Sequence, residues 1–243
     1  MLVRLFDEKD CEAYNDFLRN YENSLLYHSL KYKNFLTALL GCTDEYVLAM
    51  DGGKICGALP LMYIEQGGRR VYNSLPYYGS HGSILDNSSE ARALLTNTYN
   101  DIAVSLNTIS STVVTNVFEI KKHSFVHNYR DFRIGQVTYL SNSDSDRAQF
   151  MKRVDSSARR NVKKAKSNGI RITIENDQFE ALKTIHTDAI MKIGGIPKSN
   201  RFFELFPSFF KPDSDYNIFT ARLDGEIIAA LLLLFFNRTV EYF

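Results

Sequence analysis

The stretch YVLAMDGGKICGALPLMYI, residues 46–64, places an Asp-Gly-Gly turn between two apolar runs. Asp-Gly and Gly-Gly pairs tolerate the positive φ angles that tight hairpin turns require. We therefore predict strands over residues 46–50 and 55–64, and a third strand over 69–75 after a second Gly-Gly turn. Together these strands form a β-meander, which indicates a largely antiparallel sheet.

The same plan recurs in FTARLDGEIIAALLLL, residues 219–234, where an Asp-Gly turn again separates two apolar runs. Helices are expected ahead of both meanders, over residues 8–20, 31–40, 156–168, 178–193 and 200–210. Because helices followed by hairpin strands occur twice, the pattern favours tandem α/β domains with mixed, mostly antiparallel sheets flanked by helices. A chance likeness between two antiparallel meanders is the alternative.

The polar run SNSDSD, residues 141–146, is the candidate domain boundary, because its residues favour turns and caps over packed structure. The elements expected just before it are a helix over 89–106 and strands over 112–119 and 133–140. We predict a first domain over residues 1–143 and a second over 144–243. A strand expected from Thr239 onward is still open at the last residue, so the second domain is expected to be truncated.

The composition narrows the class of protein. A net charge of +1 gives no overall attraction to nucleic acid or to acidic membranes. The three cysteines lack the C-x-x-C spacing of zinc or redox sites, which predicts reduced thiols and no metal. The sequence begins without the apolar stretch of a secretory signal, and its most apolar run, residues 227–236, is too short to span a membrane as a helix. A cytoplasmic protein without an integral membrane segment is expected.

The segment SLPYYGSHGS, residues 74–83, is the first candidate binding element. Gly79 and Gly82 would let backbone N–H groups approach a ligand, while Tyr77, Tyr78 and His81 offer ring faces and hydrogen-bonding groups. A plain loop between a strand and a helix would explain the same residues.

The segment SSARRNVKKAK, residues 156–166, predicts a helix with a small apolar stripe and a broad basic face. Arg159, Arg160 and Lys163 are the candidate phosphate ligands on this face, since Arg makes bidentate contacts and Lys supplies a point charge. A solvated helix surface is the ordinary explanation for such a run.

A third segment, GGIPKSNRFF, residues 194–203, breaks one helix and starts the next. Its candidate ligand contacts are Gly195, Pro197 and Ser199, and His186 lies in the helix before it. The sequence has no P-loop, dinucleotide-binding fingerprint, serine-hydrolase elbow or H-E-x-x-H motif, so kinase, dehydrogenase, serine hydrolase and zinc protease activities lack their required parts.

Taken in this order, the three segments resemble the FemAB-like acyltransferases, which carry two GNAT-type N-acetyltransferase domains in tandem. Residues 74–82 are similar to the family's S-L-P-x-x-G-x-x-G pattern, and residues 159–170 to its basic helix that ends in K-x-x-G-I. Residues 194–203 are similar to its G-T-P-x-x-S-x-x-F-F stretch. Tyr32 follows His28-Ser29 where members often have Trp after Gln-Ser, and we add Tyr32 and Lys33 to the expected substrate site.

The resemblance implies transfer of an acyl or aminoacyl group onto an amine of a cell-wall or surface-polysaccharide precursor. It implies acyl-CoA or aminoacyl-tRNA as the co-substrate and no permanently bound cofactor. The expected partners are a phosphate-bearing precursor or a nucleotide sugar, tRNA for an aminoacyl donor, and a second copy of the chain at the incomplete second domain. A non-catalytic RNA- or nucleotide-binding module that uses the basic helix is the alternative, and a structural protein without ligand is a third.

Overall fold

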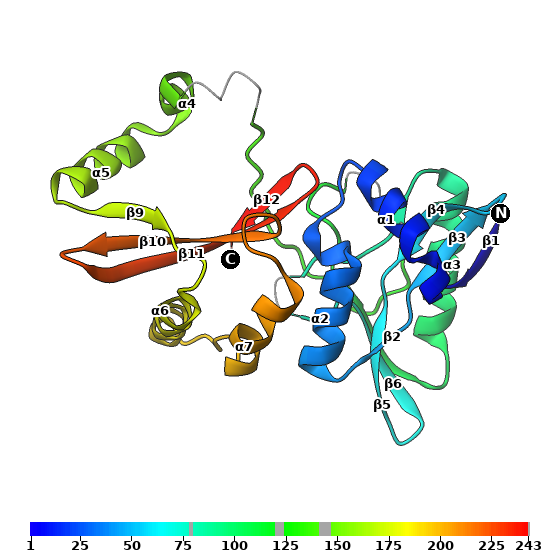
Figure 1. Ribbon diagram of the computed structural model, residues 1–243. Coiled ribbons are helices and arrows are strands. Elements are labelled where there is room, and N and C mark those ends of the chain that lie inside the picture. Colours follow the sequence, from blue (N-terminus) through cyan, green and yellow to red (C-terminus); the bar gives the residue numbers. More distant parts are fainter. Residues whose placement is uncertain (78–79, 120–123, 141–146, 243) are drawn as a thin grey trace. The chain divides into compact units, whose positions relative to one another are not determined.

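The computed structural model describes residues 1–77, 80–119, 124–140 and 147–242, and shows a mixed α/β protein with mostly antiparallel sheets (Figure 1). The chain forms two compact units, each described here by itself. Unit 1 comprises residues 1–132, 204–215 and 234–241, and unit 2 comprises 133–203, 216–233 and 242–243. The expected boundary at residues 141–146 lies outside the described residues, and the division into domains at 143/144 stays a prediction.

Unit 1 contains two four-stranded sheets. The first has the order β1-β3-β4-β7, formed by Leu2–Leu5, Val47–Asp51, Lys54–Leu59 and Leu85–Asp86. The second has the order β2-β5-β6-β8, formed by Thr43–Asp44, Met62–Gln66, Arg69–Ser74 and Thr108–Val113. The β6–β8 pair is parallel and the other pairs are antiparallel.

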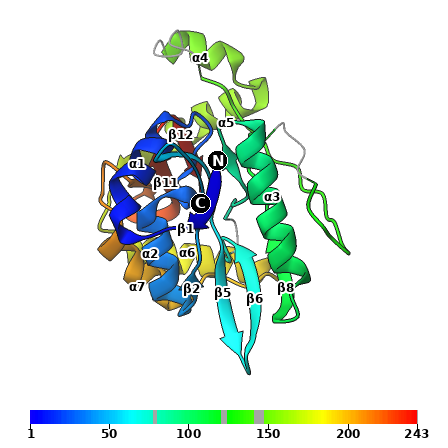
Figure 2. The same ribbon diagram turned by 90° about the vertical axis from the view of Figure 1, so that its right-hand side faces the viewer.

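The single strand predicted over residues 55–64 is wrong, because the structure divides it into β4 and β5, which belong to different sheets. The division falls at Pro60 and Leu61, both buried. Proline has no N–H to donate to a ladder, so a strand ends readily there. β5 and β6 form a hairpin that projects from the unit in Figure 2.

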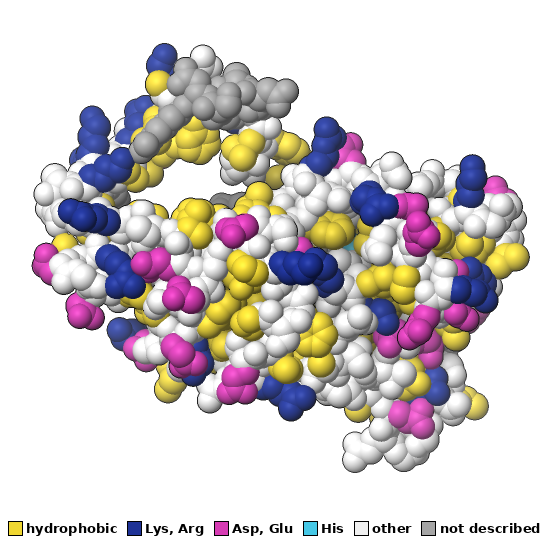
Figure 3. All heavy atoms as spheres, in the orientation of Figure 1, with side chains coloured by type: hydrophobic (Ala, Val, Ile, Leu, Met, Phe, Trp, Pro, Cys, Tyr) yellow, Lys and Arg dark blue, Asp and Glu magenta, His cyan; other side chains and the backbone are white. Residues whose placement is uncertain are grey.

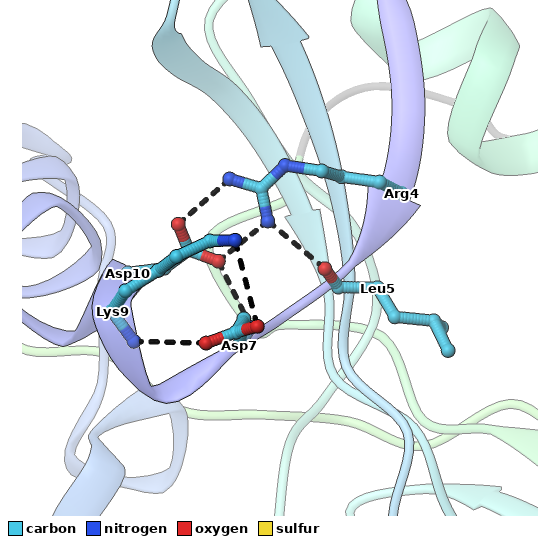
Figure 4. Close-up of polar contacts among 5 residues, drawn as sticks. All are labelled: Arg4, Leu5, Asp7, Lys9 and Asp10. Carbon is cyan, nitrogen blue, oxygen red and sulfur yellow. Dashed lines mark hydrogen bonds and ion pairs between the residues drawn. The ribbon is translucent and has the colours of Figure 1, made fainter.

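The N-terminal helix begins one turn later than predicted. Residues Glu8–Asp10 form a short 3-10 helix, η1, and α1 covers Cys11–Asn20. Asp7 caps η1 through the Lys9 N–H, and the Arg4 guanidinium holds the Asp10 carboxylate at 2.5 and 2.7 Å, as Figure 4 shows. This paired hydrogen bond lowers the pKa of Asp10 and ties β1 to the start of α1.

The other two α-helices in the first half of the chain lie close to their predicted bounds. The 3-10 helix η2 (Leu26–His28) leads into α2 (Leu30–Leu40), which ends at Gly41 in the left-handed conformation. α3 (Ser89–Val104) begins at the Ser88 cap. Leu95 and Tyr99 of α3 are buried against Val47 and Leu59 of the sheet, and this contact forms the core of unit 1.

Unit 2 contains α4 (Arg147–Arg153), α5 (Ser156–Ser167) and α6 (Phe179–Lys192). Its strands β9 (Arg171–Ile174) and β10 (Tyr216–Leu223) pair antiparallel, in a sheet of order β12-β11-β10-β9. Its core is small: Tyr216 packs edge-on against Phe179, and Leu182 is buried nearby on α6.

Three further elements have residues in unit 1: α7 (Asn200–Phe209), β11 (Glu226–Phe236) and β12 (Thr239–Tyr242). In α7, Phe206 lies 5.8 Å from the Phe35 ring of α2, and Phe210 just after the helix lies 5.5 Å from it. The Asn237 amide donates to Leu18 O and to Ser24 Oγ at 2.6 and 2.5 Å. Residues late in the sequence therefore complete the core of unit 1.

Two predicted strands differ from the structure. The strand expected over 112–119 is β8, which covers Thr108–Val113 instead. Residues 133–140 form no strand and are exposed, including Ile134 at 97% exposure. Their apolar side chains suggested a strand, but a strand also needs a neighbour that takes up its backbone hydrogen bonds, and none pairs with this segment among the described residues.

Candidate functional site

The loop between β6 and β7 is held in a strained conformation at both ends. Leu75 and Ser83 have φ angles of 61° and 74°, and both are buried. Ser83 N–H donates to Ser74 Oγ at 2.7 Å, which closes the loop on itself. Left-handed backbone in residues other than glycine costs free energy and is concentrated at functional sites, where the surrounding structure maintains it.

Gly82 lies inside this closed loop. A Cβ at Gly82 would come within 2.1 Å of Ser74 Oγ and 2.5 Å of Ser74 O, so only glycine fits there. Its N–H donates to Val114 O at 2.9 Å. The Gly82 N–H is thus already used within the fold, whereas the sequence argument had offered it to a ligand.

An aromatic cluster of unit 1 gathers beside this loop. The Tyr32 and Ser80 hydroxyls lie 2.6 Å apart, and the Tyr27 ring packs edge-on against Tyr32 at 5.1 Å. The His81 ring lies 6.0 Å from Tyr27, and the half-buried Tyr77 is close enough to contribute to the raised pKa of Tyr32. Burial is the main cause of that rise, and burial also raises the pKa of Tyr77 to about 12.

His81 has a defined proton arrangement. Its Nδ1 lies 2.9 Å from Thr115 O, and a carbonyl oxygen can only accept, so Nδ1 carries a proton. In the neutral ring Nε2 is then the acceptor. The ring is half-buried, and it contacts the Tyr27 ring in a tilted arrangement.

His28 connects η2 to the loop beside this cluster through hydrogen bonds at both ring nitrogens. Its Nδ1 accepts the Leu25 N–H at 2.9 Å, and its Nε2 donates to Gly82 O at 3.3 Å. Both ring nitrogens are therefore occupied in a neutral ring, and burial lowers the pKa of His28 to about 4. His28 therefore joins η2 to the loop between β6 and β7 (the site loop), and both of its ring nitrogens are already hydrogen-bonded within the fold.

Glu241 of β12 brings a carboxyl group to this cluster. Its side chain is half-buried, and burial raises its pKa to about 7, with the Tyr27 hydroxyl opposing part of this rise through a hydrogen bond. The Oε1 atom is buried and has no hydrogen-bond partner among the described residues. A buried carboxylate oxygen without a donor is costly, so this atom is suited to receive one from a ligand.

Several predicted site residues belong to this cluster. Tyr32, Tyr77, His81 and Gly82 lie in or beside it, whereas Tyr78 and Gly79 lie outside the described residues. The Nζ atom of Lys33 forms an ion pair with Asp44 at 2.9 Å instead of contacting these aromatic side chains. Adjacent helical residues point in different directions, which explains why Tyr32 and Lys33 separate.

Three members of the cluster were missed from the sequence: Tyr27, Ser80 and Glu241. No sequence signal pointed to Glu241, because alternation along β12 would place the apolar Val240 and Tyr242 inward, whereas the structure exposes them at 58% and 82%. In such a strand the residue between two outward side chains points inward, and an inward carboxylate is unusual.

The predicted residues of unit 2 fall into two groups. Figure 3 shows Lys and Arg side chains along α5, where Arg160 and Lys163 are exposed. Arg159 instead turns back and donates to Met151 O at 3.1 Å.

The second group, Gly195, Pro197 and Ser199, lies in the connection between α6 and α7. The His186 ring holds this connection by accepting the Lys198 N–H at Nε2, at 3.1 Å. The Lys198 ammonium lies 5.8 Å from the Phe202 ring, and burial lowers its pKa to about 8. Lys198 is not among the site residues predicted from the sequence, although it lies between two of them, Pro197 and Ser199.

A separate hollow of about 260 Å³ opens elsewhere in unit 1. It contains none of the predicted site residues, and its walls come from Asn20, Tyr21, Glu22, Asn23, Ile84, Asp86, Asn87, Phe118 and Glu119. The buried Asp86 on its wall pairs with Arg92 at 2.7 Å.

All three cysteines are unpaired. Within the described ranges no group of three or more His, Cys, Asp or Glu side chains is placed to hold a metal ion. None of the helices in the described part of the chain has the length and apolar character needed to cross a bilayer.

Comparison with known proteins gives a structural match only. No protein-family model matches the sequence, and no curated protein matches it. Among solved structures, FemX superimposes with a TM-score of 0.65 over 92% of this chain, at 16% identity. This chain has the fold of FemX. It spans 58% of the length of FemX.

A second solved structure is less similar. A GNAT family acetyltransferase from Staphylococcus aureus subsp. aureus USA300_TCH1516 aligns over 56% of this chain and 98% of its own, at 17% identity. Its TM-score of 0.33 is too low to support an argument, so the FemX match carries the fold assignment. This match agrees with the likeness to FemAB-like acyltransferases that the sequence motifs indicated.

Proposed function

We propose that this protein is a cytoplasmic N-acyltransferase of the FemAB kind. The observation that carries the proposal is the FemX fold over 92% of the chain, with the motif residues Tyr32 and His81 lying in one aromatic cluster. The enzyme would transfer an acyl or aminoacyl group from acyl-CoA or aminoacyl-tRNA to an amino group of a cell-wall or surface-polysaccharide precursor.

In this reaction the acceptor nitrogen attacks the acyl carbonyl carbon. The N–C bond forms, the bond to the CoA sulfur or to the tRNA oxygen breaks, and that leaving group takes a proton. Positioning of the two reactants and donors for the developing oxyanion supply most of the rate enhancement in such chemistry. Tyr77 and His81, together with Tyr78, are the residues that we assign to the acceptor.

The exposed cations of α5 are assigned to phosphate. Arg160 and Lys163 are exposed, whereas the Arg159 side chain reaches a backbone carbonyl. We therefore expect Arg160 and Lys163 to contribute more to binding of a phosphate-bearing precursor, nucleotide sugar or tRNA than Arg159 does.

The experiment is a thermal-shift screen of the full-length protein with acyl-CoAs, aminoacyl-tRNA and nucleotide sugars at low and high salt. A stabilising shift with one donor identifies the candidate co-substrate, and mass spectrometry then detects the amide product. Absence of any shift and of any amide product across the panel would contradict the proposal.

The alternative, a non-catalytic RNA- or nucleotide-binding module, is favoured by one observation. No side chain of α5 is buried, and its exposed cations include Arg160 and Lys163. This alternative predicts binding with a steep salt dependence and no turnover. The variant Arg160→Ala with Lys163→Ala would reduce the salt slope, and Lys192→Ala, an exposed cation on α6, is its control.

A further inference from the structure

The Glu241 carboxyl has one oxygen that could accept a hydrogen bond from a ligand. Oε1 is buried without a hydrogen-bond partner among the described residues, while Tyr27 provides a hydrogen bond to the carboxyl group. The titratable side chains that act on the Glu241 carboxyl are Tyr27 from η2 and Tyr32 from α2, and Tyr27 and Tyr32 are in turn close to His81 and Tyr77 of the loop between β6 and β7. Among the described residues, no lysine or arginine contributes to the pKa of this carboxyl.

A primary ammonium group has the chemistry that this place lacks. It carries a positive charge and three N–H donors, and it binds favourably over aromatic ring faces. The ring centroids of Tyr27 and Tyr32 lie 5.1 Å apart, and the His81 ring centroid lies 6.0 Å from that of Tyr27. A metal ion fits poorly, because no set of three ligating side chains is found within the described ranges.

We propose that Glu241, beside the rings of Tyr27 and Tyr32, binds the primary amine of the acceptor and takes its proton before acyl transfer. This role deepens the proposed function and rests on it. The ammonium N–H bond breaks, its proton joins a Glu241 oxygen, and the nitrogen lone pair becomes free to attack. The second proton lost from nitrogen goes to the leaving thiol or hydroxyl, and Glu241 returns its proton to solvent after the product leaves.

The titration of Glu241 is consistent with this role. Burial raises the pKa of Glu241 to about 7, so near neutral pH the group is able both to hold a charge opposite an ammonium and to accept a proton. A general base works best when its pKa lies near the operating pH. An ordinary exposed carboxylate would remain ionised and would be a weaker base.

The first test measures amine binding and needs no knowledge of the donor. The probe is Nα-acetyl-lysine methylamide, and its uncharged control is the analogue with a terminal hydroxyl. Carbon-13 NMR of labelled glutamate follows the Glu241 carboxyl in the full-length protein, assigned by comparison with Glu241→Gln. We expect the amine, and not the hydroxyl analogue, to lower the pKa of this carboxyl. An unchanged titration at saturating amine would overturn the inference.

The second test measures transfer once a donor is found. Glu241→Gln keeps the size of the side chain, and we expect it to lower kcat by about 10²-fold or more and to flatten the pH profile of kcat near pH 7. Tyr27→Phe keeps the ring, and should shift that profile with a smaller loss. Glu226→Gln, an exposed carboxyl on β11, is the matched control. Circular dichroism checks that each variant is folded.

The two proposals fail in different ways. If the amine lowers the Glu241 pKa but no donor gives an amide product, the amine site stands and the acyl-transfer proposal falls. If transfer proceeds normally in Glu241→Gln with an unaltered pH profile, acyl transfer stands and the role of Glu241 is overturned.

Discussion

Gly82 shows how a single position limits the site loop. A Cβ there would overlap Ser74 Oγ and the Ser74 carbonyl, and the latter belongs to the backbone and cannot rotate away. We expect Gly82→Ala to lower the free energy of unfolding by about 1–3 kcal/mol, the usual cost of overpacking. Urea denaturation measures the change, and Ser80→Ala in the same loop is the control for loss of one hydrogen bond. Equal stability of Gly82→Ala and the wild type would show that the loop relaxes easily.

His28 makes the stability of unit 1 depend on pH. Burial holds the folded-state pKa of His28 at about 4, below its value of 6.5 in the unfolded chain. As pH falls below 6.5, the His28 imidazole becomes protonated in the unfolded chain but stays neutral in the folded chain. The stability linked to neutral His28 is therefore fully present above pH 6.5 and is lost as pH falls toward 4. The free energy of unfolding falls by roughly 3 kcal/mol over this range. Denaturation measured between pH 4 and 7.5 follows this loss.

The matched comparison for His28 is an exposed histidine. His127 Nδ1 donates to the Phe125 carbonyl oxygen, and the ring is exposed. His127→Gln should leave the acid loss unchanged, whereas His28→Gln should remove much of it and also lower the stability at pH 7.5, because two buried partners lose their ring nitrogen. A steep acid loss that persists in a folded His28→Gln protein would assign the effect to other groups.

At the scale of elements, α2 carries Tyr32 into the cluster and depends on its N-cap. Ser29 Oγ accepts the Tyr32 N–H at 3.2 Å. We expect Ser29→Ala to cost about 1 kcal/mol of unfolding free energy, the usual value of a cap, and to loosen Tyr32 against Ser80. Ser29→Thr keeps a capping hydroxyl and is the control. Chemical denaturation and the tyrosine ring signals in NMR report the two effects.

The elements that the sequence predicts well are those with local signals. α2 covers Leu30–Leu40 where the sequence predicts 31–40, and β10 ends at Leu223, just before the predicted Asp-Gly turn. The strand over 55–64 and the strand over 133–140 were wrong because their ends depend on pairing partners elsewhere in the chain. An apolar run indicates that a segment is buried, but it does not indicate which neighbouring segment covers it.

The residues of the candidate site also divide into those with local sequence signals and those that depend on distant parts of the chain. Tyr32, Tyr77 and His81 were predicted because they lie in recognisable local motifs. Glu241 and Tyr27 come together from positions more than two hundred residues apart, and no spacing rule joins them. Lys33 stays a prediction, and its ion pair with Asp44 is a contact that a local motif does not reveal.

At the scale of the whole molecule, the C-terminal residues complete unit 1. Phe206 and Phe210 are buried at 1% exposure and pack on Phe35, and Asn237 bonds Leu18 and Ser24. Residues 1–143, which the sequence suggests as a domain, lack all of these contacts. The packing of unit 1 therefore depends on chain segments that are distant in sequence.

We accordingly expect a fragment of residues 1–143 to be unstable or to aggregate, because it exposes the Phe35 surface that Phe206 and Phe210 cover. A milder variant isolates the cause: Phe206→Ala in the full-length protein should cost about 3–5 kcal/mol, as large-to-small changes in a core do. Phe132→Ala is the control, since that ring is 82% exposed. Calorimetry and light scattering measure both proteins. A cooperatively folded, monomeric 1–143 fragment would show that the first domain is independent and that the late segments only dock on it.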